Sequence, residues 1–364
     1  MKLDFQQLML DATRLTRSGD LQAATVAIQA ALAGAAPAAA DTANPSKTTT
    51  IRDVSDFIDV AAREVPDDAP RSSSTPFADQ TPGPGRFIAG SHGSAGGQRD
   101  FKLYIPPGAG ERALPLVVML HGCTQNPDDF AAGTEMNAMA SAQGFYVLYP
   151  AQSQRANPQR CWNWFKHSHQ VRGRGEPALL AGMTREVMAT YAIDPDRVYV
   201  AGLSAGGAMA AILGDAYPDL FAAVGVHSGL ATGIATDLPS ALGAMQSGAS
   251  PVRSSASGVA TIVFHGDADT TVHPGNGAQV IAASAGSAAR VQVEQLKTPG
   301  GRASTRSVHR TPDGAVVAEH WLVHGAPHAW SGGSTKGSYT DARGPDASAE
   351  MMRFFMDHPR RRGH

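Results

Sequence analysis

The sequence lacks an excess of charge of either sign. Its 30 Lys and Arg residues nearly balance its 32 Asp and Glu residues, which leaves a formal net charge of −2 at pH 7. No long-range field then favours nucleic acid or an anionic membrane surface. We therefore expect a small neutral substrate and no nucleic-acid partner.

Long apolar runs are also missing. No stretch approaches the ~18 consecutive apolar residues that a membrane-spanning helix requires, so we expect no membrane span. Residues 1–16 carry Lys2, Asp4, Asp11 and Arg14 among their apolar positions. This segment therefore lacks the apolar core and small-residue cleavage site of a Sec signal peptide. The sequence alone argues against Sec export and leaves other routes open.

The chain is long enough for one large domain and an extension. Its 364 residues, of which 42% are apolar, exceed the roughly 150 residues of an ordinary domain. Apolar residues at helical spacing predict a helical extension over residues 1–65, which includes an Ala/Pro-rich linker. Pro, Ser and Asp predict a further linker over residues 66–85. We expect the main domain over residues 86–358 and a basic tail over residues 359–364.

Strand-like and helix-like segments alternate through the main domain. This alternation is typical of a largely parallel sheet with helices on both faces, and it predicts an α/β fold. The first two strands are expected to form an antiparallel pair. The expected strands span residues 86–88, 101–105, 116–120, 145–149, 198–201, 222–227, 261–264 and 316–323. The expected helices span residues 129–143, 178–191, 205–217, 276–285 and 346–356.

Gly202-Leu203-Ser204-Ala205-Gly206 is the most informative motif, because a strand-like run precedes it and a helix-like run follows it. A serine at the apex of a sharp strand-to-helix turn requires nearly side-chain-free neighbours two residues away on each side. The first amides of the following helix then point to where an oxyanion develops. The motif predicts acyl transfer with Ser204 as nucleophile, although a structural turn of the same composition is the alternative.

A serine nucleophile requires a base and a carboxylate that orients the base. In α/β-hydrolases the acid and then the histidine follow the serine along the chain. The strand over residues 261–264 leads to two aspartates, Asp267 and Asp269. We favour Asp269 as the acid, because it lies deeper in the loop. Asp267 is the alternative, and it is otherwise interpreted as a residue that forms the turn or binds amides.

The base is expected in the Gly/Pro-rich loop after the last strand. His328 lies in this loop, within Gly325-Ala326-Pro327-His328, and we predict that it is the general base. Other histidines are interpreted as residues in the strand or at its end (His320, His324) or on the surface (His273, His309).

The second oxyanion donor usually comes from the loop after the third strand. Leu120-His121-Gly122-Cys123 supplies such a loop, so we predict that the amides of Cys123 and Ala205 bind the oxyanion and that His121 braces the loop. The sequence has only two cysteines, and each can be an inert buried thiol. Because Cys123 lies in this loop and Cys161 begins an aromatic-rich segment, we hypothesise a disulfide that pins a lid beside the site.

The segments LHGCTQ, CWNWF, DPDRVYVAGLSAGGAM, HGDADTTV and HAWSGG together resemble the poly(3-hydroxybutyrate) depolymerase family of esterases, which is related to feruloyl and acetylxylan esterases. The resemblance covers residues 85–358. It implies an α/β-hydrolase fold and a serine esterase that acts on short-chain hydroxyalkanoate polyesters or oligomers through Ser204, Asp269 and His328, with Cys123 at the oxyanion position. We expect no metal and no cofactor. The candidates to line the substrate cleft are Trp162, Trp164, Trp330 and Gln125, with core packing as the alternative for the tryptophans.

Two features depart from this family. Many polymer-degrading members carry a substrate-binding domain after the catalytic domain, whereas this sequence ends at His364 after its last predicted helix. Attack on crystalline polymer is therefore not expected. The extension without a recognisable signal leaves open a cytoplasmic enzyme, whereas the cysteine pair and the resemblance favour an extracellular one. The alternative activity is that of a feruloyl, acetylxylan or general carboxylesterase. An alternative of another class is a granule-binding protein that attaches through residues 1–65.

Overall fold

A computed structural model describes residues 85–94, 97–248, 258–286 and 290–360. The helical extension expected over residues 1–65 lies outside the described residues. The same is true of the expected linker up to residue 84 and of the end of the expected basic tail from residue 361 onward.

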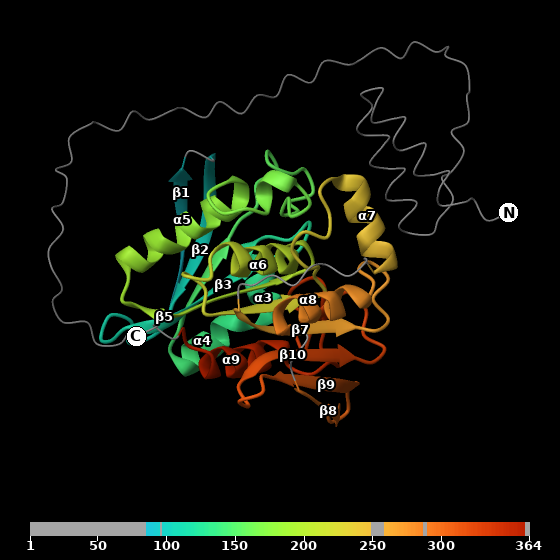
Figure 1. The fold of residues 1–364 in the computed structure, drawn as a ribbon. Helices are drawn as coiled ribbons and strands as arrows, with labels where there is room; N and C mark the ends of the chain where they lie inside the picture. The colour runs from blue at the N-terminus through green and yellow to red at the C-terminus, as the bar shows by residue number, and fades with distance from the viewer. Residues whose placement is uncertain (1–84, 95–96, 249–257, 287–289, 361–364) are drawn as a thin grey trace, which may run out of the picture. The chain divides into compact units, whose positions relative to one another are not determined.

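One large sheet organises the described part of the chain (Figure 1), with the strand order β1-β2-β4-β3-β5-β6-β7-β10-β9-β8. The six central strands, β4-β3-β5-β6-β7-β10, pair in parallel. At one edge β2 and β1 pair antiparallel with them and with each other in turn, and at the other edge β9 and β8 do the same. The strands are β1 (Arg86–Ser94), β2 (Gly97–Ile105), β3 (Leu114–Leu120), β4 (Tyr146–Pro150), β5 (Ile193–Leu203), β6 (Ala223–His227), β7 (Ala260–Gly266), β8 (Arg290–Lys297), β9 (Ala303–Arg310) and β10 (Val316–Val323). A second, short sheet pairs β11 (Trp330–Ser331) with β12 (Thr340–Asp341).

Helices cover both faces of the large sheet. The helices are α3 (Pro127–Thr134), α4 (Met136–Gln143), α5 (Gly175–Thr190), α6 (Ala205–Ala216), α7 (Leu238–Ser247), α8 (Gly275–Ala285) and α9 (Ala347–Asp357), with a short 3₁₀ helix η1 (His167–His169). Residues of α5, α6, α7 and α8 pack in one apolar core, and residues of α3, α4 and α9 pack in a second core. Among the described residues, no helix has the length and apolar character that crossing a membrane demands.

The central strands contribute to both cores because their side chains alternate between the two faces. In β3, Leu116, Val118 and Leu120 belong to one core, whereas Val117 and Met119 belong to the other. All residues of this strand are buried. Continuous apolar runs of this kind are typical of parallel strands covered on both sides. The prediction of a mostly parallel sheet with helices on both faces is confirmed.

The structure differs from the sequence prediction in several elements. The single helix predicted over residues 129–143 is wrong, because Glu135 adopts a left-handed φ of 53° and separates α3 from α4. The edge strands β8 and β9 were not predicted, and nearly every residue of β8 is exposed, so no apolar run marks it. Helix α7 was also missed. It begins at a capping box formed by Asp237 and Ser240, whose Pro, Ser and Gly neighbours resemble loop sequence.

Candidate active site

Ser204 occupies the turn between β5 and α6. Its φ of 57° and ψ of −119° lie in a region that residues other than glycine rarely adopt. A Cβ atom on Gly202 would lie 2.4 Å from the carbonyl carbon of Gly206, and a Cβ atom on Gly206 would lie 2.1 Å from the carbonyl oxygen of Leu120. Both approaches are too close for any side chain. The strained serine and its two obligatory glycines have the backbone features of a nucleophile elbow.

The elbow is fixed to the neighbouring strand. The Ser204 amide donates a 2.8 Å hydrogen bond to the carbonyl of His227, the last residue of β6. Ser204 retains 9% exposure, so only a small part of its surface is accessible to solvent.

Asp269 and His328 come together from the loops that follow β7 and β10. His328 Nδ1 lies 2.7 Å from Asp269 Oδ2. The other carboxylate oxygen accepts hydrogen bonds of 2.9 Å from the amides of Thr271 and Val272. Burial alone would raise the pKa of Asp269, but the hydrogen bond and charge of His328, with the Val272 amide, outweigh burial and hold this pKa below its usual value. Asp269 therefore stays ionised and orients the His328 ring.

Asp267 binds a different histidine. Its Oδ2 lies 2.8 Å from His324 Nδ1, and its Oδ1 accepts a 2.6 Å hydrogen bond from the Gly325 amide. This pair is partly exposed, and it ties the β7 loop to the end of β10. Of the two aspartates considered from the sequence, the structure places Asp269 against His328.

The remaining candidate histidines do not contact Asp269 in the described structure. His320 lies in β10 and His324 directly after it, as predicted. His273 is exposed, as predicted, and its Nδ1 accepts a hydrogen bond from the Gly275 amide. His309 lies in β9 and is half-buried, so its interpretation as a surface residue is only partly right.

Two buried histidines near the site were missed by the sequence analysis. The His227 ring stacks on Phe264 and Trp330, and its Nε2 accepts a hydrogen bond from the Ser331 amide. Burial lowers the pKa of His227 to about 3, so this ring is neutral. His265 Nε2 donates to the Val272 carbonyl at 2.9 Å, and burial lowers its pKa as well. Their positions at the carboxyl ends of β6 and β7 are the sequence signal that could have found them.

The loop after β3, residues 121–126, is held by several contacts and is called the β3 loop below. The hypothesis of a disulfide is confirmed, because Cys123 is bonded to Cys161. His121 Nδ1 donates to the Gly122 carbonyl, and its Nε2 accepts from the Gln152 amide at 3.1 Å. Burial lowers the pKa of His121 to about 4. This neutral, doubly hydrogen-bonded ring braces the loop.

The side chains proposed to line the cleft are enclosed by protein. Trp162 is 0% exposed, Trp330 1%, Gln125 2% and Trp164 5%. Gln125 Oε1 accepts from the Gly122 amide, and its Nε2 donates to Asp129. This burial fits the alternative of core packing for the tryptophans, and it gives Gln125 a structural contact within the β3 loop.

An exposed aromatic residue contacts the β3 loop instead. Tyr339 is 47% exposed and has a left-handed φ of 52°. Its hydroxyl lies 3.2 Å from Thr124 Oγ1 in the β3 loop, where Thr124 is also left-handed with a φ of 66°. The Tyr339 carbonyl accepts a hydrogen bond from the Trp330 amide, two residues after His328. Tyr339 thus bridges the β3 loop and the His328 loop, a position that no sequence motif indicated.

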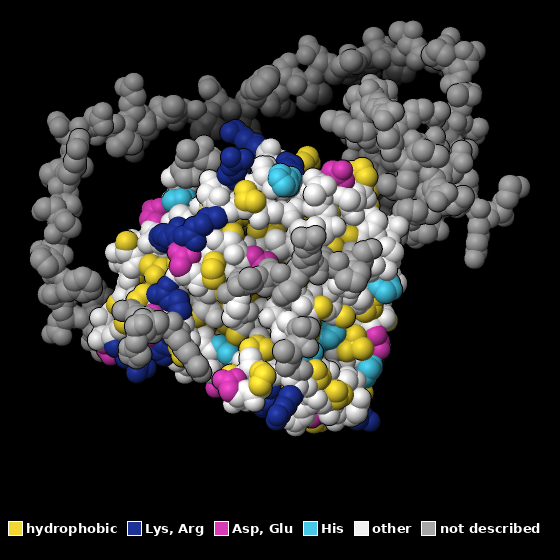
Figure 2. Space-filling model, viewed as in Figure 1, with side chains coloured by type: hydrophobic (Ala, Val, Ile, Leu, Met, Phe, Trp, Pro, Cys, Tyr) yellow, Lys and Arg dark blue, Asp and Glu magenta, His cyan; other side chains and the backbone are white. Residues whose placement is uncertain are grey.

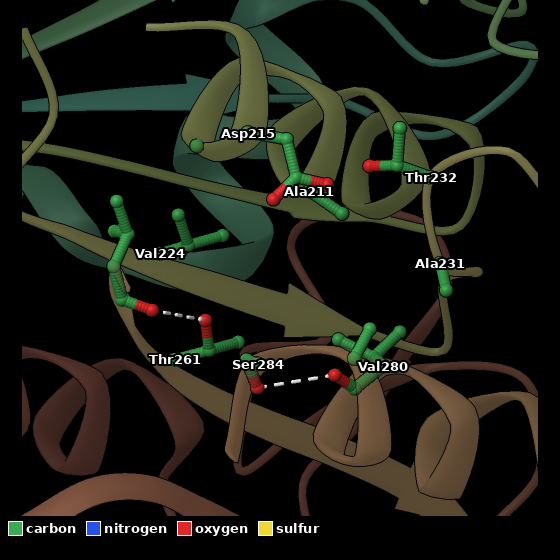
Figure 3. Close-up of a pocket in the computed structure, with 11 residues that line it drawn as sticks. Ala211, Asp215, Val224, Ala231, Thr232, Thr261, Val280 and Ser284 are labelled. Carbon is green, nitrogen blue, oxygen red and sulfur yellow. Dashed lines mark hydrogen bonds between the residues drawn. The ribbon is translucent and has the colours of Figure 1, made fainter. Parts of the chain in front are cut away.

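The described structure also contains two cavities of different size. The pocket in Figure 3 is lined by residues of α6, β6, β7 and α8, including Asp215, Thr261 and Ser284. Its volume of about 20 Å³ suits about one water molecule. A larger pocket of about 320 Å³ is lined mostly by polar residues, which include Arg99, Gln152 and, from the β3 loop, Asn126. Within the described ranges, no group of three or more His, Cys, Asp or Glu side chains is placed to hold a metal ion.

The space-filling view shows mixed charge on the face that it presents (Figure 2), with Lys and Arg side chains interspersed with acidic ones. No single sign dominates this face, in keeping with the near-zero net charge.

Residues 99–302 match the model of the family described as Esterase PHB depolymerase. The chain is 31% identical over 239 residues to poly(3-hydroxyalkanoate) depolymerase C of Paucimonas lemoignei, which covers 62% of this chain and 57% of that protein. It is 36% identical over 135 residues to poly(3-hydroxybutyrate) depolymerase of Ralstonia pickettii, which covers 35% of this chain and 27% of that protein.

A feruloyl esterase is also similar. Feruloyl esterase B of Thermothelomyces thermophilus is 32% identical over 140 residues, which covers 38% of this chain and 47% of that protein. The matches to these three relatives thus cover less than two thirds of each relative's own length. Among solved structures, an acetyl xylan esterase from Aspergillus awamori has a TM-score of 0.57 at 18% identity and covers 76% of this chain and 100% of that chain. This likeness concerns the fold, and the predicted α/β-hydrolase fold is confirmed.

Proposed function

Because the chain belongs to the Esterase PHB depolymerase family, its matched region is an esterase domain, and we propose that it hydrolyses the ester bonds of short-chain polyhydroxyalkanoates. We further propose Ser204, His328 and Asp269 as the reacting triad. The observation that carries this proposal is the Asp269–His328 hydrogen bond of 2.7 Å at the same sheet edge as the Ser204 elbow. These residues follow β5, β7 and β10, and parallel strands bring their carboxyl ends to one edge.

In the proposed mechanism, Asp269 keeps the proton of His328 on Nδ1, so that Nε2 is free to accept a proton. Nε2 takes the proton of the Ser204 hydroxyl as Oγ attacks the ester carbonyl. His328 then returns this proton to the departing alcohol, which leaves an acyl-enzyme on Ser204. Water, deprotonated by His328, attacks the acyl group and releases the acid, and the proton returns to Ser204.

The amides of Cys123 and Ala205 are proposed to stabilise the tetrahedral oxyanion. Within the described residues, neither amide donates a hydrogen bond to another protein group. Ala205 is the first residue of α6, where the helix dipole favours negative charge. Donors held at fixed positions cost no reorganisation when the charge develops.

The decisive test of the substrate is release of 3-hydroxybutyrate from the amorphous polymer and from its soluble oligomers. We expect the purified protein to release it from both, and we expect Ser204→Ala to release none. Methyl ferulate, acetylated xylan and p-nitrophenyl butyrate serve as comparison substrates. Cleavage of these esters without attack on either hydroxybutyrate substrate would move the assignment to a feruloyl, acetylxylan or general carboxylesterase.

We propose that Tyr339 contacts the part of the substrate that extends out of the site. Tyr339→Ala is expected to raise KM for 3-hydroxybutyrate oligomers about twofold to tenfold, which is the change in binding that the loss of one aromatic contact produces. It should leave kcat/KM for p-nitrophenyl acetate nearly unchanged, because this short ester lacks the extended part that is proposed to contact Tyr339.

Tyr339→Phe separates the ring from the Thr124 hydrogen bond, and Leu238→Ala is a control at an exposed apolar residue of α7. Equal losses on oligomers and on p-nitrophenyl acetate would argue against a substrate contact.

A further inference from the structure

A buried carboxylate lies behind the β3 loop. Glu176 belongs to the first turn of α5 and is 3% exposed. Glutamates are rarely buried unless they are paired, because a charge loses its hydration in the interior. Burial alone would raise the pKa of Glu176, but the neighbouring His169 ring and the hydrogen bonds from Gln152 and Asn163 outweigh it and hold the pKa below its usual value. This side chain is therefore an ionised carboxylate inside the protein.

Amide groups of Gln152 and Asn163 donate hydrogen bonds to both oxygens of this carboxylate, and two further side-chain nitrogens lie nearby. Gln152 Nε2 and Asn163 Nδ2 donate to Oε1 at 2.5 and 2.7 Å, and the Asn163 amide donates to Oε2 at 2.7 Å. His169 Nδ1 lies 3.5 Å from Oε2, and Arg99 Nη2 lies 3.9 Å from Oε1. Only a group that accepts at both oxygens satisfies this set. A glutamine in this position would turn its NH₂ group toward at least one donor.

The two segments that bind Glu176 are the same segments that hold the β3 loop. Gln152 uses its amide to donate to His121 Nε2, and its side chain also donates to the Cys161 carbonyl at 3.0 Å. Trp162 precedes Asn163 and donates from Nε1 to the His121 carbonyl at 3.1 Å. Cys161 is covalently joined to the β3 loop by its disulfide with Cys123. Three separate contacts therefore connect the surroundings of Glu176 to the two ends of His121-Gly122-Cys123.

We propose that Glu176 is a positioning residue that fixes the Cys123 amide for oxyanion binding, acting through Gln152 and the segment 161–163. This inference rests on the proposed function, because the Cys123 amide has a role only if the oxyanion forms at Ser204. An oxyanion donor is effective when it lies within about 2.7–3.1 Å of the developing charge. Loosening the β3 loop would weaken a contact that strengthens in the transition state. It would therefore lower kcat more than it raises KM.

The test is Glu176→Gln, with Glu186→Gln as the matched control. Glu186 lies in the same helix, but its side chain is 54% exposed and faces His92. On p-nitrophenyl butyrate, well below the unfolding temperature, we expect Glu176→Gln to lower kcat about tenfold to a hundredfold, somewhat less than complete removal of a donor. We expect KM to change less than twofold, and Glu186→Gln to match the parent protein.

A second readout isolates the oxyanion. An alkylboronic acid forms a charged tetrahedral adduct with the serine. In Glu176→Gln, the affinity for this boronic acid should therefore fall in proportion to kcat, whereas the affinity for an uncharged ester analogue should stay the same. A purely structural role would lower Tm and leave unchanged the ratio of boronate affinity to the affinity for the uncharged ester analogue. That result would overturn the inference. Wild-type kcat in folded Glu176→Gln would also overturn it. If Glu176→Gln does not fold, Gln152→Leu serves as the test instead. It removes one of the hydrogen-bond donors to Glu176 and should lower both kcat and the affinity for the boronic acid. Wild-type values for both in Gln152→Leu would then overturn the inference.

Failure of the proposed function gives a different result. Activity that survives in Ser204→Ala would remove the serine mechanism altogether. Loss of activity in Ser204→Ala, together with an unaffected Glu176→Gln enzyme, would reject only the positioning role.

Discussion

Ser204→Ala and Asp269→Asn are each expected to lower kcat for p-nitrophenyl butyrate by about 10⁴-fold or more, while the protein stays folded. Alanine removes the attacking oxygen. Asparagine accepts less strongly from His328 Nδ1 and can present an NH₂ group instead, which favours the wrong tautomer of the base. Alanine adopts the left-handed conformation of Ser204 at a similar cost to serine, so we expect little change in the free energy of unfolding. Far-ultraviolet circular dichroism and Tm of each variant check the fold.

Asp267→Asn is the matched control. It changes the same chemical group two residues away in the same loop, but it affects the partly exposed pair with His324. We expect its kcat to fall less than about tenfold, because the structure gives it no contact with the reacting groups and exposed ion pairs contribute little. A larger loss in Asp267→Asn than in Asp269→Asn would reassign the acid. Full activity in Ser204→Ala would reject the serine mechanism.

The residues proposed as the triad could be selected from the sequence because each lies in a turn or loop that follows a strand of the central sheet. Ser204, Asp269 and His328 lie after β5, β7 and β10; β5 and β7 end in continuously buried runs, whereas β10 is marked by its apolar content with buried and half-buried residues. Parallel pairing then dictates that the three loops share one edge of the sheet. The order of strands and the spacing of motifs therefore carry enough information to select these residues.

Residues whose importance depends on distant partners could not be predicted in this way. Glu176 has the sequence environment of an ordinary first-turn glutamate, and only the fold brings Gln152 and Asn163 to it. The composition of CWNWF suggests an aromatic lid, but it does not tell which side of the segment faces the interior. The structure buries Trp162 completely, with its Nε1 directed to the β3 loop. The exposed Tyr339 lacks any motif, because a left-handed residue in a loop leaves no periodic pattern.

Acid is expected to destabilise the protein steeply from about pH 6.5 downward, because several histidines are buried in neutral form. Burial lowers the pKa of His121 to about 4 and of His227 to about 3, whereas both titrate near 6.5 in an unfolded chain. Between these values the unfolded state binds protons that the folded state does not. The free energy of unfolding therefore falls as the pH falls, by up to about 1.4 kcal/mol per pH unit for each histidine.

These two histidines alone remove about 5 kcal/mol between pH 7.5 and pH 4.5, which is comparable to the total stability of many domains. Carboxylates extend the effect to lower pH. Hydrogen bonds and charges from Arg306 and Arg353 outweigh burial and hold the pKa of Glu319 below its usual value. Its stabilisation is present above the unfolded pKa of about 4.3 and is lost as the pH falls through the lower folded pKa.

Urea unfolding followed by tryptophan fluorescence, at a series of pH values from 8 to 4.5, measures this dependence. His227→Gln is expected to reduce the slope of stability against pH by about 1.4 kcal/mol per pH unit at its steepest, even if the variant is less stable at pH 8. His273→Gln changes an exposed histidine and should leave the slope unaltered. Stability that stays constant down to pH 5 would mean that the buried rings accept protons in the folded state. The stacking of His227 between Phe264 and Trp330 would then have to accommodate a charge, and the ring would lose its acceptor role toward the Ser331 amide.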